Sequence, residues 1–317
     1  MAGATLMGRY ALKRLLQGLV TIWFIATATF AAMHAVPGDP LSNEKATTEA
    51  IRKNLEARYG LDRPVFPDQY LIFLGNMAKG DFGLSFTQQN RRVNDIIGDA
   101  FPVSAQLGVL AITFAALGGV LLGAFTALKR NRWPDVTVML AVILGISVPS
   151  FVFAALGQLA LVNINEALGF TFLPVAGWGD VSQMIMPALV LGLSTLAFLT
   201  RLMRSSMLEV LTADYIRTAR AKGVSEAGIF WRHALRNASL PVITVLGPAI
   251  AAITTGGFVV ELVFAIPGLG RAFVEAVQQL DYTLIMGTTV FYGSFLVFMV
   301  IIVDLLYGLI DPRVRLS

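Results

Sequence analysis

Six long apolar segments constrain the fold of this chain more than any other feature of its sequence. A bilayer core about 30 Å thick is crossed by roughly 20 apolar residues in a helix. Lipid offers the backbone no hydrogen-bond partners, so each segment should be helical, and none alternates like a membrane β-strand. We therefore predict an all-α polytopic membrane protein with six transmembrane helices. The segments are about Leu15–Val36, Pro102–Leu128, Val136–Val162, Val181–Thr200, Leu240–Val260 and Leu284–Leu309.

The composition agrees with a membrane protein. Hydrophobic residues make up 56% of the 317 residues and charged residues only 14%, which is too few charges for the surface of a soluble domain of this size. The absence of cysteine excludes disulfides, thiol catalysis and thiolate metal sites. The first apolar segment resembles a signal peptide, but it is longer than one and no A-x-A site follows it before Pro37. We expect it to be retained as a span.

The basic residues of the short loops predict the orientation. The loop after the second segment holds Lys129, Arg130 and Arg132, and the C-terminal tail holds Arg313 and Arg315. The loop after the third segment has no Lys or Arg, and the loop after the fifth has only one. Because Lys and Arg concentrate on the cytoplasmic side, both termini are expected in the cytoplasm. The loop after the fourth segment adds seven more: Arg201, Arg204, Arg217, Arg220, Lys222, Arg232 and Arg236.

These assignments divide the chain into four parts. Residues 1–36 are the cytoplasmic N-terminus and first helix, 37–101 an outer, periplasmic loop domain, 94–309 the main transmembrane domain and 310–317 a cytoplasmic tail. The cytoplasmic segment 201–239 lies inside the transmembrane domain. The helices of that domain are expected at about 102–128, 136–162, 181–200, 240–260 and 284–309.

The two outer loops contain short helical patterns. Apolar residues recur at helical spacing over 51–59 and over 70–77, with stops at Gly60 and Lys79-Gly80. This first outer loop, about Pro37 to Phe101, is either a cap over the spans or a docking surface for an external partner. In the loop after the fifth segment, AIPGLG (265–270) precedes a short helix near Arg271–Gln279. Its Pro and Gly indicate either backbone that dips toward the membrane or an ordinary turn.

The sequence lacks the groups that catalysis or ion coupling requires. It contains no H-E-x-x-H, no G-x-S-x-G and no phosphate-binding G-x-x-x-x-G-K-[ST] motif. Its two histidines, His34 and His233, fall on opposite faces of the predicted membrane. The middles of the spans carry no charge, and Asp304, near the inner end of the last span, is interpreted as a structural charge. We therefore expect no enzyme, no metal and no ion-driven pump.

The segment Asp214–Pro241 is unusually polar for this chain. We expect Asp214 to cap one short helix, Gly223-Val224-Ser225 to break it, and Ser225 to cap a second helix that Pro241 ends. Small residues at Ala219, Ala221 and Gly223 permit close approach of a partner, and Arg217, Arg220 and Lys222 supply charge. The alternative is an amphipathic helix held at the interface by anionic lipid.

At this point the sequence resembles a known family. The stretch DYIRTARAKG…RHALRNASLPV resembles the cytoplasmic EAA loop of bacterial ABC importer permeases of the di/oligopeptide and nickel branch. The order of the matching segments is that of the first permease subunit of oligopeptide systems. Further similar segments are HAVPGDP, YGLDRPVFPDQYLIFLGNMAKGDFGLSF, FPVSAQLG, SVPSFVFA, VVELVFAIPGLGRAF and DLLYGLIDPRVR.

One departure from the broader importer pattern is visible. Arg217-Thr218-Ala219 occupies the E-A-A positions, and Pro241 follows Gly223 by eighteen residues rather than about thirteen. The peptide branch has this longer spacing, but contacts known from sugar importers cannot be transferred one by one.

The resemblance implies a division of labour. This chain would form a type I importer pore with a second, similar permease, and would import peptide that an extracytoplasmic binding protein delivers. Two cytoplasmic ATPases would carry ATP and magnesium, so this chain needs no cofactor. One ATPase would grip a coupling site formed by Asp214, Tyr215, Arg217, Ala219, Arg220, Lys222 and Gly223. The binding protein or gate side would include Pro267, Gly268, Gly270 and Arg271.

Two other classes of protein remain open from the residues alone. One is a scaffold that assembles partners and moves nothing, and the other is a channel or secondary transporter. No nucleic acid is expected as a partner. The cargo is also open among oligopeptides, dipeptides, glutathione and metal chelates.

Overall fold

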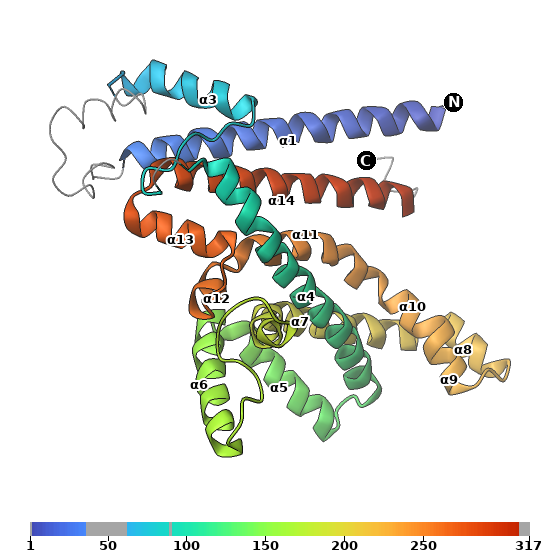
Figure 1. Ribbon diagram of the computed structural model, residues 1–317. Coiled ribbons are helices and arrows are strands. Elements are labelled where there is room, and N and C mark those ends of the chain that lie inside the picture. The colour runs from blue at the N-terminus through green and yellow to red at the C-terminus, as the bar shows by residue number, and fades with distance from the viewer. Residues whose placement is uncertain (1, 36–61, 89–90, 311–317) are drawn as a thin grey trace. The chain divides into compact units, whose positions relative to one another are not determined.

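The computed structural model describes residues 2–35, 62–88 and 91–310. In these ranges the chain is helical apart from turns and one isolated β-bridge, between Leu84 and Arg92 (Figure 1). It forms two compact units: Met1–Ser104 with Pro267–Ser317, and Ala105–Ile266. The long helix α4 (Val93–Leu128) contributes to both units. We call them the terminal unit and the central unit.

The terminal unit is built on two long helices that lie side by side, α1 (Ala2–Ala35) and α14 (Tyr282–Ile310) (Figure 1). Glycines allow the close approach. A Cβ added at Gly18 of α1 would lie 2.9 Å from Cγ1 of Val297, and one at Gly293 of α14 would lie 2.8 Å from Cδ1 of Ile25. Small residues at helix crossings are typical of packing in membranes, where the hydrophobic effect does not drive helices together.

The segment that precedes α4 in the terminal unit packs on the C-terminal part of α1. A π-helical turn, η1 (Val65–Gln69), leads into α3 (Tyr70–Ala78). Lys79 caps its C-terminus, and Gly80 follows with a φ of +73°. The helix predicted over 70–77 is therefore confirmed. The Tyr70 hydroxyl lies 2.8 Å from Oγ1 of Thr27 on α1. The pattern predicted over 51–59 lies outside the described residues.

The central unit contains α5 (Trp133–Ser147), α6 (Ser150–Leu168) and α7 (Val181–Thr212), besides most of α4. The prediction of one helix over 136–162 is wrong, because the chain breaks between α5 and α6. Val148 precedes Pro149, whose ring disfavours helical backbone at the residue before it, and Val148 is extended with φ −91° and ψ 128°.

The fifth predicted span is also interrupted. It begins with α11 (Leu240–Gly256), and Gly257 separates this helix from α12 (Phe258–Val263). Glycine loses more backbone freedom on entering a helix than any other residue, so a helix is readily interrupted there.

Five described helices are long and apolar enough to cross a membrane: α1, α4, α6, α7 and α14. Residues Glu226–Ala238 and Leu240–Thr254 together would make a sixth, bent by 44°. Helix α5, with 15 residues, spans only about 22 Å. The all-α polytopic fold is thus confirmed, whereas the domain limits and the cytoplasmic location of the termini stay predictions.

Candidate functional site: a protruding helical segment and a pocket of the terminal unit

The polar segment after α7 begins with α8 (Asp214–Ala221). Its C-terminus is closed by two backbone hydrogen bonds. The Gly223 N–H donates to the Arg220 carbonyl at 2.9 Å, and the Val224 N–H donates to the Ala219 carbonyl at 3.2 Å. This is the Schellman arrangement, which needs a left-handed residue after the helix, and Gly223 supplies it with φ +80°. The helix break predicted at Gly223 is confirmed.

The two predicted caps have different outcomes. Ser225 does cap the next helix, α9 (Glu226–Gly228), since its Oγ accepts the Gly228 N–H at 3.2 Å. Asp214 does not cap α8, because the N-cap is Ala213 and Asp214 is already the first helical residue. The Asp214 carboxylate instead faces Arg217, 3.5 Å away and one turn on. Both side chains of that pair are exposed.

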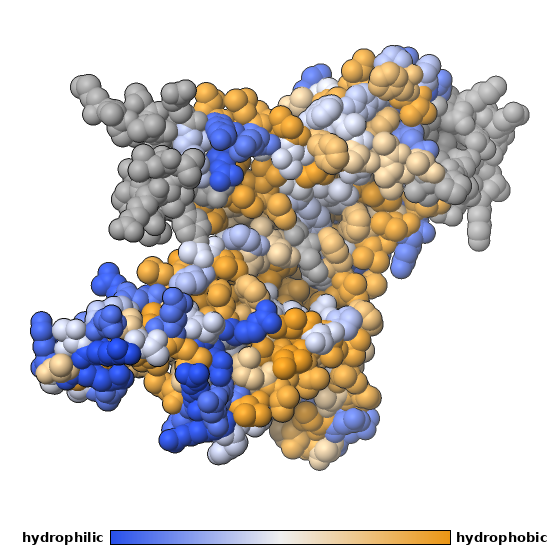
Figure 2. All heavy atoms as spheres, turned by 180° about the vertical axis from the view of Figure 1, so that it is seen from behind, coloured by the Kyte–Doolittle hydropathy of each residue, from blue (hydrophilic) through white to orange (hydrophobic). Residues whose placement is uncertain are grey.

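The predicted coupling residues lie on the surface of the chain. All are exposed except Ala219, which is half-buried. The Tyr215 hydroxyl accepts a hydrogen bond from Nδ2 of Asn237 at 3.0 Å, so the start of α8 is tied to the returning helix. Figure 2 shows hydrophilic residues gathered over this α8–α10 end of the central unit. The exposed set is Asp214, Tyr215, Arg217, Arg220, Lys222 and Gly223.

An exposed ion pair spans the turn between α8 and α9. The guanidinium of Arg220 donates to both carboxylate oxygens of Glu226, at 2.8 and 3.2 Å. The hydrogen bond from Arg220 lowers the pKa of Glu226, and the same bond raises the pKa of Arg220. Both groups therefore stay charged at neutral pH. The pair borders an open cavity of about 500 Å³ whose apolar lining includes Leu211, Ile229 and Phe230.

The exposed surface stands on a buried base. Ile216 of α8 is fully buried, as is Ile229 of η2 (Ile229–Ala234). Ala234, together with Ala238 of α10 (Leu235–Ala238), packs against the C-terminal parts of α4 and α7. The members of this cluster are Ala124, Ala127, Leu199, Met203, Met207, Ala234, Ala238 and Val242. The returning segment is thus packed directly against two long helices of the central unit.

Pro241 does not end the second helix as predicted. Helix α10 ends at Ala238, Ser239 keeps helical dihedrals, and Pro241 lies in the first turn of α11. Proline is tolerated there, while its missing N–H and its ring bend the chain. The result is the 44° bend between the returning segment and α11.

Helices α4 and α7 touch backbone to backbone at two glycines of α4, Gly119 and Gly123. A Cβ at Gly123 would lie 2.6 Å from Cβ of Met203, and one at Gly119 would lie 2.7 Å from Cβ of Leu199. The two glycines form a G-x-x-x-G motif in an apolar helix, a recognised sequence signal for close helix packing. Sequence reasoning missed this contact although the signal was present.

A second missed feature joins α5 to α7. Arg204 donates from Nε and Nη2 to the two carboxylate oxygens of Asp135, both at 2.7 Å. The Asp135 side chain is 4% exposed and also accepts the Asn131 N–H at 2.9 Å. Sixty-nine residues separate the partners, so no local sequence pattern reveals the pair.

The predicted outer residues gather at the start of α13 (Leu269–Gln279), whose position agrees with the helix expected near 271–279. The Leu269 N–H donates to Oγ of Ser104 on α4 at 2.9 Å, which fixes the helix start. Gly268 and Gly270 are buried, Pro267 is exposed and Arg271 is half-buried.

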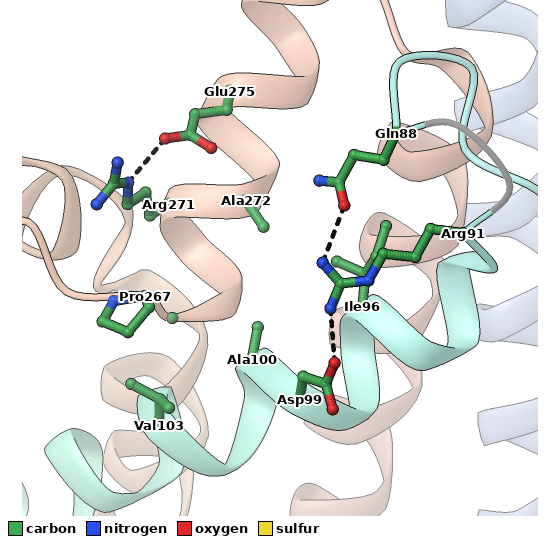
Figure 3. A pocket seen from close by; sticks show the side chains of 11 residues that line it. Gln88, Arg91, Ile96, Asp99, Ala100, Val103, Pro267, Arg271, Ala272 and Glu275 are labelled. Atoms are coloured by element: carbon green, nitrogen blue, oxygen red, sulfur yellow. Dashed lines mark hydrogen bonds and ion pairs between the residues drawn. The ribbon is translucent and has the colours of Figure 1, made fainter. Parts of the chain in front are cut away.

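Pro267, Gly268 and Arg271 border a cavity of about 440 Å³ in the terminal unit (Figure 3), and Gly270 does not. Its apolar floor includes Ile96 and Ala100. Two ion pairs flank it, Arg271 with Glu275 at 2.7 Å on α13 and Arg91 with Asp99 at 2.6 Å beside α4. Figure 3 shows Arg91 held between Asp99 and Gln88.

Asp281 was not predicted, and it anchors the segment that precedes α4. It is fully buried at the start of α14, where its Oδ1 accepts the Leu284 N–H at 3.1 Å. Its Oδ2 accepts hydrogen bonds from the Ser85 hydroxyl and from the Thr87 backbone and hydroxyl. One carboxylate therefore caps a helix and holds the chain around residues 85–87.

Other predicted features are not tested by these contacts. Asp304 lies in α14, but its side chain is outside the described part of the structure. Within the described residues, no group of three or more His, Asp or Glu side chains is arranged to hold a metal ion.

Comparison with known proteins shows the class of protein that this arrangement belongs to. Residues 119–316 match the family described as the inner membrane component of binding-protein-dependent transport systems. Residues 7–108 match the N-terminal region of the membrane component of such systems. The chain therefore belongs to this family. It is a multi-pass component of the inner membrane that serves transport, and not an enzyme.

Similar curated proteins cover nearly the whole chain. A dipeptide transport system permease protein, DppB, of Bacillus subtilis is 47% identical over 98% of this chain and 99% of its own length. An oligopeptide transport system permease protein, OppB, of Haemophilus influenzae is 43% identical over 98% of this chain and all of its own. The OppB of Escherichia coli K12 is 40% identical over the same shares.

Proposed function

We propose that this chain is the permease subunit of an ATP-binding-cassette importer and forms half of a pore for di- or oligopeptides. The observation that carries the proposal is the exposed, rigid α8–α9 surface on a base packed against α4 and α7. The chain has no phosphate-binding motif of its own, so the energy must enter from another subunit. The similarity to permeases named for dipeptides and oligopeptides supports the cargo class.

The partners follow from this division of labour. A second, homologous permease completes the pore, and two cytoplasmic ATPases bind ATP and magnesium. One ATPase seats on the coupling surface formed by Asp214–Gly223. Closure of the ATPases pulls α8, and the buried cluster transmits that movement to α7 and α4 as rigid bodies. An extracytoplasmic binding protein delivers peptide to the opposite side, where Pro267, Gly268, Gly270 and Arg271 contact it or line the gate.

Reconstituted uptake tests the proposal. The complex is placed in liposomes with ATP inside, the binding protein is added outside, and uptake of labelled di-, tri- and pentapeptides is measured. ATP-dependent uptake of at least one peptide class is expected. Uptake of glutathione or a nickel chelate with no uptake of peptides would contradict the proposed cargo.

Two rival functions give different results in the same experiment. A scaffold would co-purify without ATPases and a binding protein, and would take up nothing. A secondary transporter would continue uptake without ATP and lose it when an ionophore collapses the ion gradient. Either result would overturn the assignment to an ATP-driven importer.

A further inference from the structure

The turn between α4 and α5 carries three cations and a tryptophan that the coupling mechanism does not use. Trp133, the first residue of α5, is 79% exposed. The residues that precede it are exposed as well. The cations are Lys129, Arg130 and Arg132.

Backbone hydrogen bonds fix this turn. The Lys129 N–H donates to the Phe125 carbonyl at 3.1 Å, and the Arg132 N–H donates to the Lys129 carbonyl at 3.0 Å. Asn131 takes the left-handed conformation with φ 60°, which Asn tolerates better than most residues. Its N–H is held by Asp135. The three cations are therefore displayed from a rigid backbone rather than from a floppy loop.

The nearest carboxylate is already occupied. Asp135 binds Arg204 through both oxygens and accepts the Asn131 N–H. Across the described ranges, the side chains of Lys129, Arg130 and Arg132 form no ion pair and donate no hydrogen bond. Within the described residues, none of the three cations is therefore paired with a carboxylate at ion-pair distance. Asp135 interacts with Arg130 only at longer range, and its single charge is matched by Arg204.

The exposed face of α5 continues from the turn as an apolar stripe. The residues of this stripe recur at helical spacing and so share one face of the helix. No described part of the chain covers that face. The residues are Val136, Leu140, Ile143 and Leu144. Along one strip of surface the order is therefore hydrocarbon side chains, then an indole ring, then cations. This is the order of a lipid leaflet from its core to its headgroups, because Trp prefers the interface and Lys and Arg prefer the headgroup phosphates.

We propose that the α4–α5 turn is a binding site for anionic phospholipid headgroups. These lipids belong to the leaflet on the same side of the membrane as the coupling surface Asp214–Gly223. The acyl chains lie along the apolar stripe of α5, Trp133 lies at the interface, and the three cations hold the phosphate. The N-terminus of α5 does not serve as the anion site, since the Asp135 carboxylate occupies its first turn. A docked ATPase would account for the cations but not for the continuous apolar stripe below them.

The absence of cysteine makes a direct test practicable. Thr137 is exposed one turn after Trp133, so Thr137→Cys is labelled with bimane in a complex whose partner subunits lack accessible cysteine. The labelled transporter is reconstituted in mixtures of phosphatidylglycerol and phosphatidylcholine, with brominated chains on one lipid or the other at equal mole fraction. We expect brominated phosphatidylglycerol to quench at least about twofold more strongly than brominated phosphatidylcholine.

Variants separate this site from general charge attraction. Lys129→Gln, Arg130→Gln and Arg132→Gln together should make quenching by the two lipids equal. A control that removes three other exposed cations, Arg63→Gln, Lys79→Gln and Arg92→Gln, should keep the preference.

Three outcomes would overturn the proposal. They are equal quenching in the wild type, a preference that survives the triple change in the turn, and quenching that is absent in the full complex but appears once the ATPases are stripped from it. The last would show that the ATPase covers this strip. Peptide uptake is measured in parallel, so failure of this proposal is distinguishable from failure of the transport assignment.

Discussion

Arg204 of α7 grips Asp135 at the start of α5 with two hydrogen bonds of 2.7 Å. The pair joins α7, which leads directly into the coupling surface Asp214–Gly223, to α5, which lies far from that surface in sequence. Because the Asp135 side chain is almost wholly buried, its charge needs the guanidinium partner. We infer that α5 moves with α7 when the coupling segment is displaced.

Removing one partner of this pair should destabilise the protein. Asp135→Ala leaves the Arg204 charge without its carboxylate, and breaking a buried pair in this way costs about 3–5 kcal/mol. We expect a value near the lower end, because Arg204 is partly exposed. Thermal unfolding of the complex in detergent measures the effect. The double change Asp135→Leu with Arg204→Met should recover most of the loss, and an additive double-mutant cycle would contradict the interaction.

The contact of α4 with α7 predicts a large difference between two glycines of the same helix. Gly123→Ala places a methyl group 2.6 Å from Cβ of Met203 and from the Thr200 carbonyl, so the helices must separate and the melting temperature should fall. Gly98→Ala has nothing within 4 Å. Removing a flexible glycine from an exposed helix position should stabilise the helix by about 0.5–1 kcal/mol. Equal melting temperatures for the two variants would show that the close packing is not important for stability.

Charge reversal on the coupling surface should uncouple the transporter. Arg217 is exposed on α8 and forms only a weak surface pair, so Arg217→Glu should leave folding intact. Uptake of peptide should fall at least about tenfold, while insertion and permease pairing persist. Arg236→Glu is the matched control, with the same charge change at an exposed site of the returning helix. If both variants transport equally well, α8 does not carry the specific contact.

Substitutions at Gly223 should reduce stability and uptake by amounts that follow a predictable order. Gly223 has a φ of +80° and open space around it, so the cost of a substitution is set by backbone conformation alone. Gly223→Asn should keep most activity because Asn tolerates the left-handed region. Gly223→Val should cost more than Gly223→Ala, which itself should cost about 1–2 kcal/mol. Uptake and melting temperature measured across the three variants check this order. A smaller loss for Gly223→Ala than for Gly223→Asn, the order that side-chain volume alone gives, would contradict it.

Local signals in the sequence predicted much of the fold. Apolar length located the long helices, and the glycine at 223 with the serine at 225 predicted the break and the second cap correctly. The proline at 149 carried a signal for the break between α5 and α6 that apolar length alone overrode. Asp214 was misplaced by one residue, which is the ordinary uncertainty of a helix start.

Long-range relationships could not be predicted in the same way. The bond of Arg204 to Asp135 and the hydrogen bonds of Asp281 to Ser85 and Thr87 join residues far apart in the chain. Such pairs depend on which helices become neighbours, and hydrophobic periodicity does not encode that. The exposure of the coupling residues was likewise invisible in the sequence, because small and basic residues also suit a helix lying in lipid headgroups.

Site-specific thiol labelling tests the central claim most directly, since the chain has no cysteine of its own. Ala221→Cys is placed at the exposed end of α8, and Ala78→Cys at the exposed end of α3. In intact cells a membrane-impermeant maleimide should label position 78 and not position 221. In inside-out vesicles stripped of ATPases it should label position 221, and adding the ATPases back should protect that site. Labelling of position 221 from outside the cell, or labelling unchanged by the ATPases, would contradict a cytoplasmic coupling surface.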